Sequence, residues 1–335
     1  MAKINFYIIK NGIIARKHNT IYFFFRDENE QIQRKILPIE KIYQIFCYGR
    51  VTVRSGALSY LMKYKVPIHF FNKYGFYEGS FWPRECLVSG SLLVKQVEHF
   101  LNKEKRLYLA KAFVKGSLQN ILVNLRYYER EGKDLNQSIS EIETLIEKIE
   151  NVGKISELMA IEGNAKEKYY QSWNLFLPEK FKFEKRTRKP PENMINALIS
   201  FGNSLVYSVC LSEIYNTQLN PTISYLHEPF ERRFSLSLDL AEVFKPLLAD
   251  RVIFKLIKKK KADESYFRKE LNFCVLNEKG KRVFLEEFEN KLKTTIKHKT
   301  LKRKISYQRL IRLECYKLIK HLLGIKKYKP FIIWW

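Results

Sequence analysis

The sequence has few of the residues that build disulfide scaffolds, zinc sites or disordered tails. Its five cysteines are an odd number, stand far apart and form no CxxC pair (Cys47, Cys86, Cys210, Cys274 and Cys315). This spacing argues against a disulfide framework and a zinc site, and it predicts buried free thiols in a reducing compartment. Only 13 Gly and 10 Pro occur among 335 residues, which argues against long disordered stretches.

The sequence also lacks a long apolar run. No run approaches the roughly 18 residues that indicate a membrane-spanning helix. The N-terminal stretch MAKINFYIIKNG is interrupted too soon for a signal peptide. These absences predict a cytoplasmic protein that does not cross a membrane.

Acidic residues are scarce relative to basic ones. The chain has 61 Lys and Arg against 35 Asp and Glu, a net charge of +26, and residues 251–335 alone carry 25 basic and 8 acidic side chains. Such an excess repels itself in a compact fold unless a polyanion compensates it. Nucleic acid is therefore the favoured partner. An anionic membrane surface and a merely solvated basic face are the alternatives.

Residues 1–85 carry the signals of short β-strands. Several stretches rich in β-branched and aromatic residues are separated by turn residues. The pair Asn11-Gly12 between two of them favours a hairpin. One short helix is expected over 53–65, and a turn at 72–75 separates two further extended pieces. We therefore predict an antiparallel β domain that contains one short helix.

From Ser89 onward the apolar residues recur at helical spacing. A first stripe includes Val94, Val97, Leu101, Leu109 and Phe113, and longer helical stretches are expected at 145–177, 194–215 and 235–257. The predicted fold class is α+β, with a β-rich domain at 1–85 and a mostly α-helical domain at 86–335.

Glu162 is the first candidate for chemistry. It follows apolar residues in a stretch that is expected to be helical, where a buried carboxylate is costly unless a cation compensates it. Gly163, directly after it, suggests close approach of another backbone. Taken alone, Glu162 is explained more simply as an exposed residue on an amphipathic helix.

His227, Asp239 and Glu242 form a second group. His227 lies between Pro221 and Pro229 and is expected on a turn. The two acids follow in SLSLDLAEVFKPLL, where their spacing of three places them on one face of a helix that is apolar nearly all round. Two carboxylates on one turn of a buried helix repel each other unless a metal or a shared proton resolves the repulsion.

Salt bridges explain the same acids equally well. Asp239 could pair with Arg232 or Arg233, and Glu242 with Lys245. If a metal is bound instead, carboxylates with one imidazole suit Mg²⁺ or Mn²⁺. Beside a phosphodiester, such an ion would support phosphoryl transfer on nucleic acid, in agreement with the charge.

Three stretches of the sequence resemble the CRISPR-associated Cas1 family of DNA integrases. They are AIEGNAKEKYYQSW, RTRKPPENMINALISFGNSLVY and YLHEPFERRFSLSLDLAEVFKPLLADRVIF. Together with the β-then-α order, the resemblance covers essentially the whole chain and is strongest over 153–258. The HEPFERR and SFGN forms are most similar to the type I-B branch.

The resemblance implies a fold, a metal site and a reaction. Family members combine a β domain that mediates dimerisation with a helical domain that holds one metal. The family motifs place the ligands of Mg²⁺ or Mn²⁺ at Glu162, His227 and Glu242, with Asp239 in a supporting catalytic role. The implied reaction joins the 3′-hydroxyl ends of captured DNA to the CRISPR repeat by transesterification, and hydrolyses DNA when water is the nucleophile.

The resemblance also implies partners. They are double-stranded DNA, a second copy of the chain in a homodimer, and a Cas2 protein that joins two such dimers in a heterohexamer. In this branch a Cas4 nuclease is a further expected partner.

Basic residues near the motifs are candidates for DNA binding. Arg186, Arg188 and Lys189 lie in a Pro-bounded loop, for which a solvated linker is the alternative, and Arg232 and Arg233 follow His227 closely. Arginine suits phosphate because its planar guanidinium offers two donors at once. From the residues alone, a non-catalytic DNA-binding scaffold and a general structure-specific nuclease remain competing functions.

Overall fold

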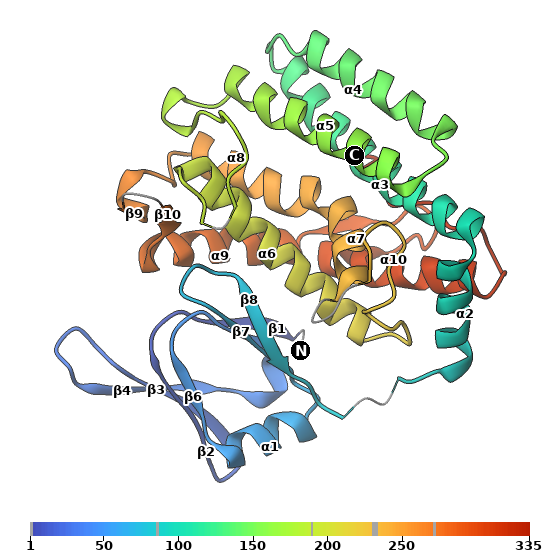
Figure 1. Ribbon diagram of the computed structural model, residues 1–335. Helices are drawn as coiled ribbons and strands as arrows, with labels where there is room; N and C mark the ends of the chain where they lie inside the picture. Colours follow the sequence, from blue (N-terminus) through green and yellow to red (C-terminus); the bar gives the residue numbers. More distant parts are fainter. Residues whose placement is uncertain (1–2, 85–86, 189, 230–233, 271–272) are drawn as a thin grey trace. The chain divides into compact units, whose positions relative to one another are not determined.

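The computed structural model spans residues 1–335 and describes all of them except 1–2, 85–86, 189, 230–233 and 271–272 (Figure 1). The chain forms two compact units, one of residues 1–86 with 276–289 and the other of residues 87–275 with 290–335. The expected division at residue 85 placed everything after it in one helical domain. In the structure, the stretch 276–289 instead groups with the β-rich unit.

The β-rich unit contains two four-stranded sheets, ordered β1-β5-β7-β8 and β4-β3-β2-β6. Their strands are β1 (Ile4–Ile8), β2 (Gly12–Lys17), β3 (Thr20–Arg26), β4 (Ile32–Leu37), β5 (Ile42–Cys47), β6 (Val51–Val53), β7 (Ile68–Phe71) and β8 (Tyr77–Phe81). The pairs β1–β5, β5–β7 and β2–β6 are parallel, whereas β2–β3, β3–β4 and β7–β8 are antiparallel. The β-rich start is confirmed, but the prediction that it is antiparallel throughout was wrong.

The turn at Asn11-Gly12 does not close a hairpin. The strands on either side of it belong to different sheets, and Asn11 Oδ1 accepts a hydrogen bond from the backbone N of Arg50 at 2.8 Å. Glycine is needed at position 12 because a Cβ there would lie 2.1 Å from the carbonyl oxygen of Phe24. The predicted hairpin was therefore wrong, because local turn residues do not reveal whether the flanking strands pair.

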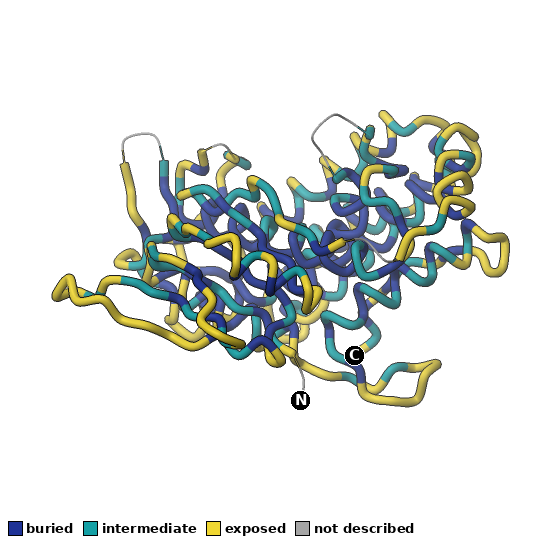
Figure 2. The backbone as a smooth tube through the Cα atoms, turned by 90° about the horizontal axis from the view of Figure 1, so that it is seen from below, coloured by how far each residue is buried: buried dark blue, intermediate teal, exposed yellow. Residues whose placement is uncertain are grey.

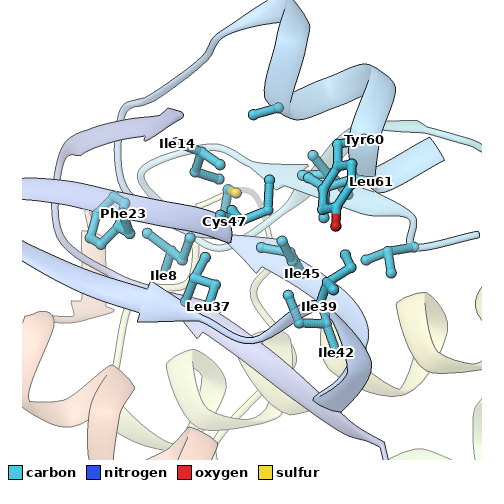
Figure 3. Close-up of a cluster of buried hydrophobic side chains, with 14 residues drawn as sticks. Ile8, Ile14, Phe23, Leu37, Ile39, Ile42, Ile45, Cys47, Tyr60 and Leu61 are labelled. Carbon is cyan, nitrogen blue, oxygen red and sulfur yellow. The ribbon is translucent and has the colours of Figure 1, made fainter. Parts of the chain in front are cut away.

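The core of the β-rich unit lies where its strands meet helix α1 (Ser55–Lys63). Figure 3 shows Ile8, Ile14, Ile45 and Leu61 converging from β1, β2, β5 and α1, and each is at most 5% exposed. The short helix expected over 53–65 is thus confirmed. Its apolar side closes the core and leaves its polar residues outside.

The helical unit is built from α2 (Gly90–Leu101), α3 (Lys103–Arg130), α4 (Asn136–Lys148), α5 (Ile155–Ser172), α6 (Met194–Tyr215), α7 (Ser235–Lys245), α8 (Arg251–Lys258) and α10 (Tyr307–Leu322). Helix α9 (Glu278–Lys293) starts in the β-rich unit, and short strand pairs form from β9 (Phe267–Glu270) with β10 (Phe273–Leu276) and from β11 (Thr295–Lys297) with β12 (Lys304–Ser306). A π-helical segment, Pro246–Asp250, joins α7 to α8. The predicted order of β-strands followed by helices is confirmed.

Helix α6 is the central apolar helix of this unit. By length and composition it could cross a membrane, but 83% of its apolar window is buried inside the fold, as in the core helix of a globular protein. Figure 2 shows the same division along the chain, with buried stretches in dark blue and exposed positions in yellow. The apolar content of α6 is therefore explained by burial within the unit.

Helix α2 presents a different face from the one that its apolar residues indicate. Val94 and Leu101 are 66% and 72% exposed, whereas Leu92, Gln96 and His99 are buried. The helical period was predicted correctly, but the buried face was not. Gln96 is buried because its side chain binds the backbone of another segment, which apolar periodicity cannot reveal.

Candidate metal centre

Two acidic residues from different helices meet at one lysine. Glu162 lies within α5 and Glu242 within α7, and the Lys166 ammonium, one turn after Glu162, contacts both carboxylates. Lys245 adds a second cation, with its Nζ 2.5 Å from Glu242 Oε1. All four side chains are at most 20% exposed. The result is a buried cluster of two acids and two lysines.

Electrostatics keep Glu242 and Lys166 ionised. Burial by itself raises the pKa of Glu242, but the two lysines outweigh burial and hold that pKa well below its usual range. Burial likewise lowers the pKa of Lys166, but Glu162 and Glu242 outweigh it and raise the pKa above the ordinary lysine value. For Lys245 burial is the larger effect, and its pKa is lowered. Glu242 is therefore a carboxylate, and Lys166 an ammonium, at physiological pH.

His227 is held by Asp239, which is fully buried in α7. The Nδ1 of the imidazole lies 2.7 Å from Asp239 Oδ1. The same carboxylate accepts hydrogen bonds from the backbone N of Tyr225 at 2.7 Å, and of Leu226 and His227 at 3.0 Å. A carboxylate on Nδ1 fixes the orientation of the ring and leaves Nε2 as the nitrogen that can face a ligand.

The structure thus joins the predicted residues in two pairs, Glu162 with Glu242 and His227 with Asp239. Among the residues that the structure describes, no three His, Cys, Asp or Glu side chains are grouped as a metal site requires. The donor types fit Mg²⁺ or Mn²⁺, since they are carboxylate oxygens and one imidazole nitrogen. A divalent cation between the two carboxylates would replace the Lys166 ammonium. The metal and its three ligands stay predictions.

The alternative interpretation as salt bridges is correct for one pair. Glu242 does bind Lys245, whereas the proposed partners of Asp239, Arg232 and Arg233, lie outside the described residues. Lys166 was missed, although its spacing of four from Glu162 is a readable helical signal. The suggested close approach at Gly163 was wrong, because nothing lies within 4 Å of a Cβ built there.

Asp250 is a further buried acid that the sequence did not single out. It ends the π-helical segment after α7, and its Oδ2 accepts a hydrogen bond from the Tyr169 hydroxyl at 3.0 Å. Its other oxygen has no partner among the described residues. Burial raises the pKa of Asp250 to about 7.

The DNA-binding candidates fall into three groups. The guanidinium of Arg186 already binds other residues of the chain, since it donates to Asn196 Oδ1 and Ser200 Oγ at 2.9 Å. Burial lowers the pKa of Arg186 to about 10. Arg188 is exposed. Lys189, Arg232 and Arg233 lie outside the described residues. DNA binding by these five residues remains a prediction, and the structure gives Arg186 a second role in anchoring its loop to α6.

Comparison with known proteins identifies the family. The model of the family CRISPR associated protein Cas1 matches residues 6–290. A CRISPR-associated protein Cas1 of Methanobrevibacter ruminantium is 53% identical over 335 residues and covers all of both chains. A CRISPR-associated endonuclease Cas1 of Fusobacterium nucleatum is 50% identical over 333 residues, which are 99% of this chain and 97% of the relative.

Solved structures agree with this result. A Cas1 protein from Thermotoga maritima has a TM-score of 0.85 and 40% identity, covering 98% of this chain and 99% of the other. A casposase bound to integration product has the same TM-score at 21% identity, covering 98% of this chain and 93% of the other. A Cas6-RT-Cas1–Cas2 complex has a TM-score of 0.83 at 19% identity, covering 99% of this chain and 36% of the other. The last two share the fold, and the close sequence matches settle the family: this chain belongs to the CRISPR-associated Cas1 proteins.

Proposed function

We propose that this chain is a metal-dependent DNA endonuclease and integrase of CRISPR adaptation. The observation that carries the proposal is the meeting of Glu162 and Glu242, from different helices, at the ammonium of Lys166, whose side chain is 20% exposed. Family membership supports it, since a relative of 50% identity is named an endonuclease. The cytoplasmic location and the type I-B branch belong to the same proposal.

In the proposed reaction, the 3′-hydroxyl of a captured DNA fragment attacks a phosphodiester at the boundary of the CRISPR repeat. A bond forms between the attacking oxygen and phosphorus, and the bond from that phosphorus to the 3′-oxygen of the repeat breaks. The attacking hydroxyl loses its proton and the leaving oxygen gains one, so one phosphodiester replaces another. With water as the nucleophile, the same displacement is hydrolysis.

Each residue of the site has a proposed task. Glu162, Glu242 and His227 would hold Mg²⁺ or Mn²⁺, which when bound stabilises negative charge on the phosphoryl group. Asp239 fixes His227 through Nδ1, so that Nε2 faces the ligand. Lys166, whose ammonium the metal would displace from between the two carboxylates, would stay close by on α5 as a cation that can offset the charge of the DNA phosphate.

The proposed partners are DNA and other proteins of the adaptation machinery. The net charge of +26 suits double-stranded DNA. A solved complex that shares this fold contains Cas2, which supports a Cas2 partner here. We further propose that residues 1–85 mediate a homodimer, that two dimers and Cas2 form a heterohexamer, and that a Cas4 nuclease joins the process.

An integration assay with a labelled DNA fragment and a CRISPR repeat, with Cas2 present, tests the proposal. In Mn²⁺ or Mg²⁺ the wild-type chain should join the fragment to the repeat, and a chelator should abolish joining. Glu162→Gln and His227→Ala should retain DNA binding and lose strand transfer. Unchanged strand transfer by both variants would discard the site. Joining without Cas2 would contradict the proposed partnership.

A non-catalytic DNA-binding scaffold is the second candidate. It is favoured by the fact that Lys166 and Lys245 already neutralise Glu242. A scaffold would show no binding of Mn²⁺ by electron paramagnetic resonance and the same DNA affinity with and without chelator. Stoichiometric Mn²⁺ binding that is lost in Glu162→Gln would exclude it.

A further inference from the structure

We propose that Arg106 is a positioning residue for His227, because it binds the loop of residues 220–228 on both sides of that histidine. The inference rests on the proposed function of His227. It adds a residue that lies far from the family motifs, in the second helix of the helical unit.

Arg106 lies near the start of α3 and makes two bonds to the loop. Its Nε donates to the carbonyl oxygen of Tyr225 at 3.0 Å, and a terminal nitrogen donates to Glu228 Oε1 at 2.6 Å. These contacts fall two residues before and one residue after His227. The arginine side chain is only 15% exposed, and its guanidinium lies 4.4 Å from the ring centroid of Phe100. The bond to the Tyr225 carbonyl is therefore partly sheltered from water, whereas the Glu228 side chain, 65% exposed, leaves the second bond open to solvent.

The opposite side of the loop is bound by α7. Asp239 accepts the backbone N–H of Tyr225, while Arg106 donates to the carbonyl of the same residue. The backbone of Tyr225 is therefore hydrogen-bonded through its N–H to a buried carboxylate and through its carbonyl to a guanidinium. Without Arg106, the bonds from Asp239 would remain but nothing among the described residues would hold the Tyr225 carbonyl from the α3 side.

Helix α2 fixes the start of the loop in a similar way. Gln96 Nε2 donates to the Asn220 carbonyl at 3.1 Å, and the backbone N of Asn220 donates to Gln96 Oε1 at 2.8 Å. Gln96 is fully buried. The loop is thus held by α2 and α3 through Gln96 and Arg106 and by α7 through Asp239. Of the contacts from α2 and α3, those of Arg106 lie nearer to His227 in the chain.

Arginine is required for this task because one planar guanidinium reaches two acceptors in fixed directions. Lysine would keep the charge opposite Glu228 but has no second rigid donor for the Tyr225 carbonyl. A displacement of about 1 Å in a reacting group can reduce the rate about 100-fold. Loss of Arg106 should therefore act through the position of the imidazole and leave DNA affinity unchanged.

The test compares Arg106→Met, Arg106→Lys and the control Arg126→Met in the full-length chain assembled with Cas2. Arg126 lies in the same helix and pairs with Glu143 on the surface, with a side chain that is 50% exposed. Measurements are kcat and KM for strand transfer, the dissociation constant of Mn²⁺ by electron paramagnetic resonance, and thermal stability. We expect Arg106→Met to lower kcat about 10- to 100-fold and to weaken Mn²⁺ binding at least about 10-fold. KM for DNA should change less than about twofold, and Arg126→Met should match the wild type.

Arg106→Lys should fall between the wild type and Arg106→Met. If Arg106→Met fails to fold, Arg106→Lys and Glu228→Gln replace it, and wild-type kcat and Mn²⁺ affinity in both would overturn the proposal. A rise in KM for DNA at unchanged kcat would also overturn it, because Arg106 would then be a DNA contact. His227→Ala separates this outcome from failure of the proposed function: if it abolishes strand transfer while Arg106→Met does not alter it, only the positioning role is wrong.

Discussion

The strands of the β-rich unit and helix α7 of the helical unit both bury polar side chains, but the strands bury neutral groups and α7 buries acidic ones. In the β-rich unit, Gln44 Nε2 donates to Asn5 Oδ1 at 2.9 Å, and His69 Nε2 donates to Gln44 Oε1 at 3.1 Å. Burial lowers the pKa of His69 to about 3, so the ring is neutral at physiological pH. This network links β1, β5 and β7 through neutral side chains, and at its edge Asn5 Nδ2 donates to the Glu289 carboxylate at 2.8 Å.

In the helical unit, by contrast, Glu242 is a buried side chain that carries a charge. Its carboxylate is 5% exposed and stays ionised only because Lys166 and Lys245 lie against it. A buried ion pair adds little net stability compared with an apolar alternative. Folding explains the neutral network, and the proposed function assigns the charged one a task in chemistry.

The largest expected effect comes from removing the charge of Glu242. Glu242→Gln keeps the shape of the side chain, and we expect strand transfer to fall about 100- to 1000-fold, the range seen when one group that stabilises a transition state is removed. DNA affinity, measured by fluorescence anisotropy, should stay within about twofold. A wild-type rate would make the charged network structural, like the neutral one.

Asp250 tests whether a buried acid in the helical unit makes the stability of the chain depend on pH. Its pKa is raised to about 7 in the folded chain, against about 3.9 for an ordinary aspartate, so the folded state holds a proton that the unfolded state releases between these values. Stability contributed by the proton is full below about pH 4 and is lost as the pH rises to about 7.

We therefore expect Asp250→Asn to gain about 3 kcal/mol relative to the wild type between pH 5 and pH 8, since each tenfold change in the acid constant is worth about 1.4 kcal/mol. Urea unfolding at the two pH values measures the difference. A constant difference between the two proteins would show that Asp250 does not titrate in this range.

Asp239→Asn sharpens the comparison inside the helical unit. The variant weakens the acceptor for three backbone N–H groups and for His227 Nδ1, so strand transfer should fall about 10- to 100-fold. Glu213→Gln is the matched control, because it neutralises another buried carboxylate, one that Arg312 binds at 2.7 Å. The control should lose stability but keep its turnover per folded molecule. Equal loss of turnover in both variants would assign Asp239 to folding alone.

The smallest effect is expected in the β-rich unit. His69→Leu leaves Gln44 Oε1 without its ring partner, and an unsatisfied buried acceptor costs about 1 to 3 kcal/mol, whereas the Ser80 hydroxyl keeps its bond to the Tyr77 hydroxyl at 2.7 Å. The free energy of unfolding should fall by about 2 kcal/mol, and turnover per folded molecule should not change. A specific loss of strand transfer at unchanged stability would contradict a purely structural role.

Local pattern was sufficient for much of this molecule. Helix α6 begins and ends at the residues that its apolar stretch indicates, and α7 buries Asp239 and Glu242 as their neighbours predict. These features depend on neighbours within a few turns of helix, so a short window of sequence contains them. The spacing of Asp239 and Glu242 identified the helix of the candidate site for the same reason.

Contacts between distant segments were decided only by the tertiary structure. The parallel pairing of β1 with β5, the meeting of Lys166 with Glu242 and the hold of Arg106 on Tyr225 all join residues that are far apart in the chain. No short window of sequence contains both partners of such a contact. The sequence around a polar helical residue also does not show whether its side chain faces solvent or a buried acceptor. Packing determines the partners, because a buried polar group needs a hydrogen-bond partner and the fold determines which partner lies within reach.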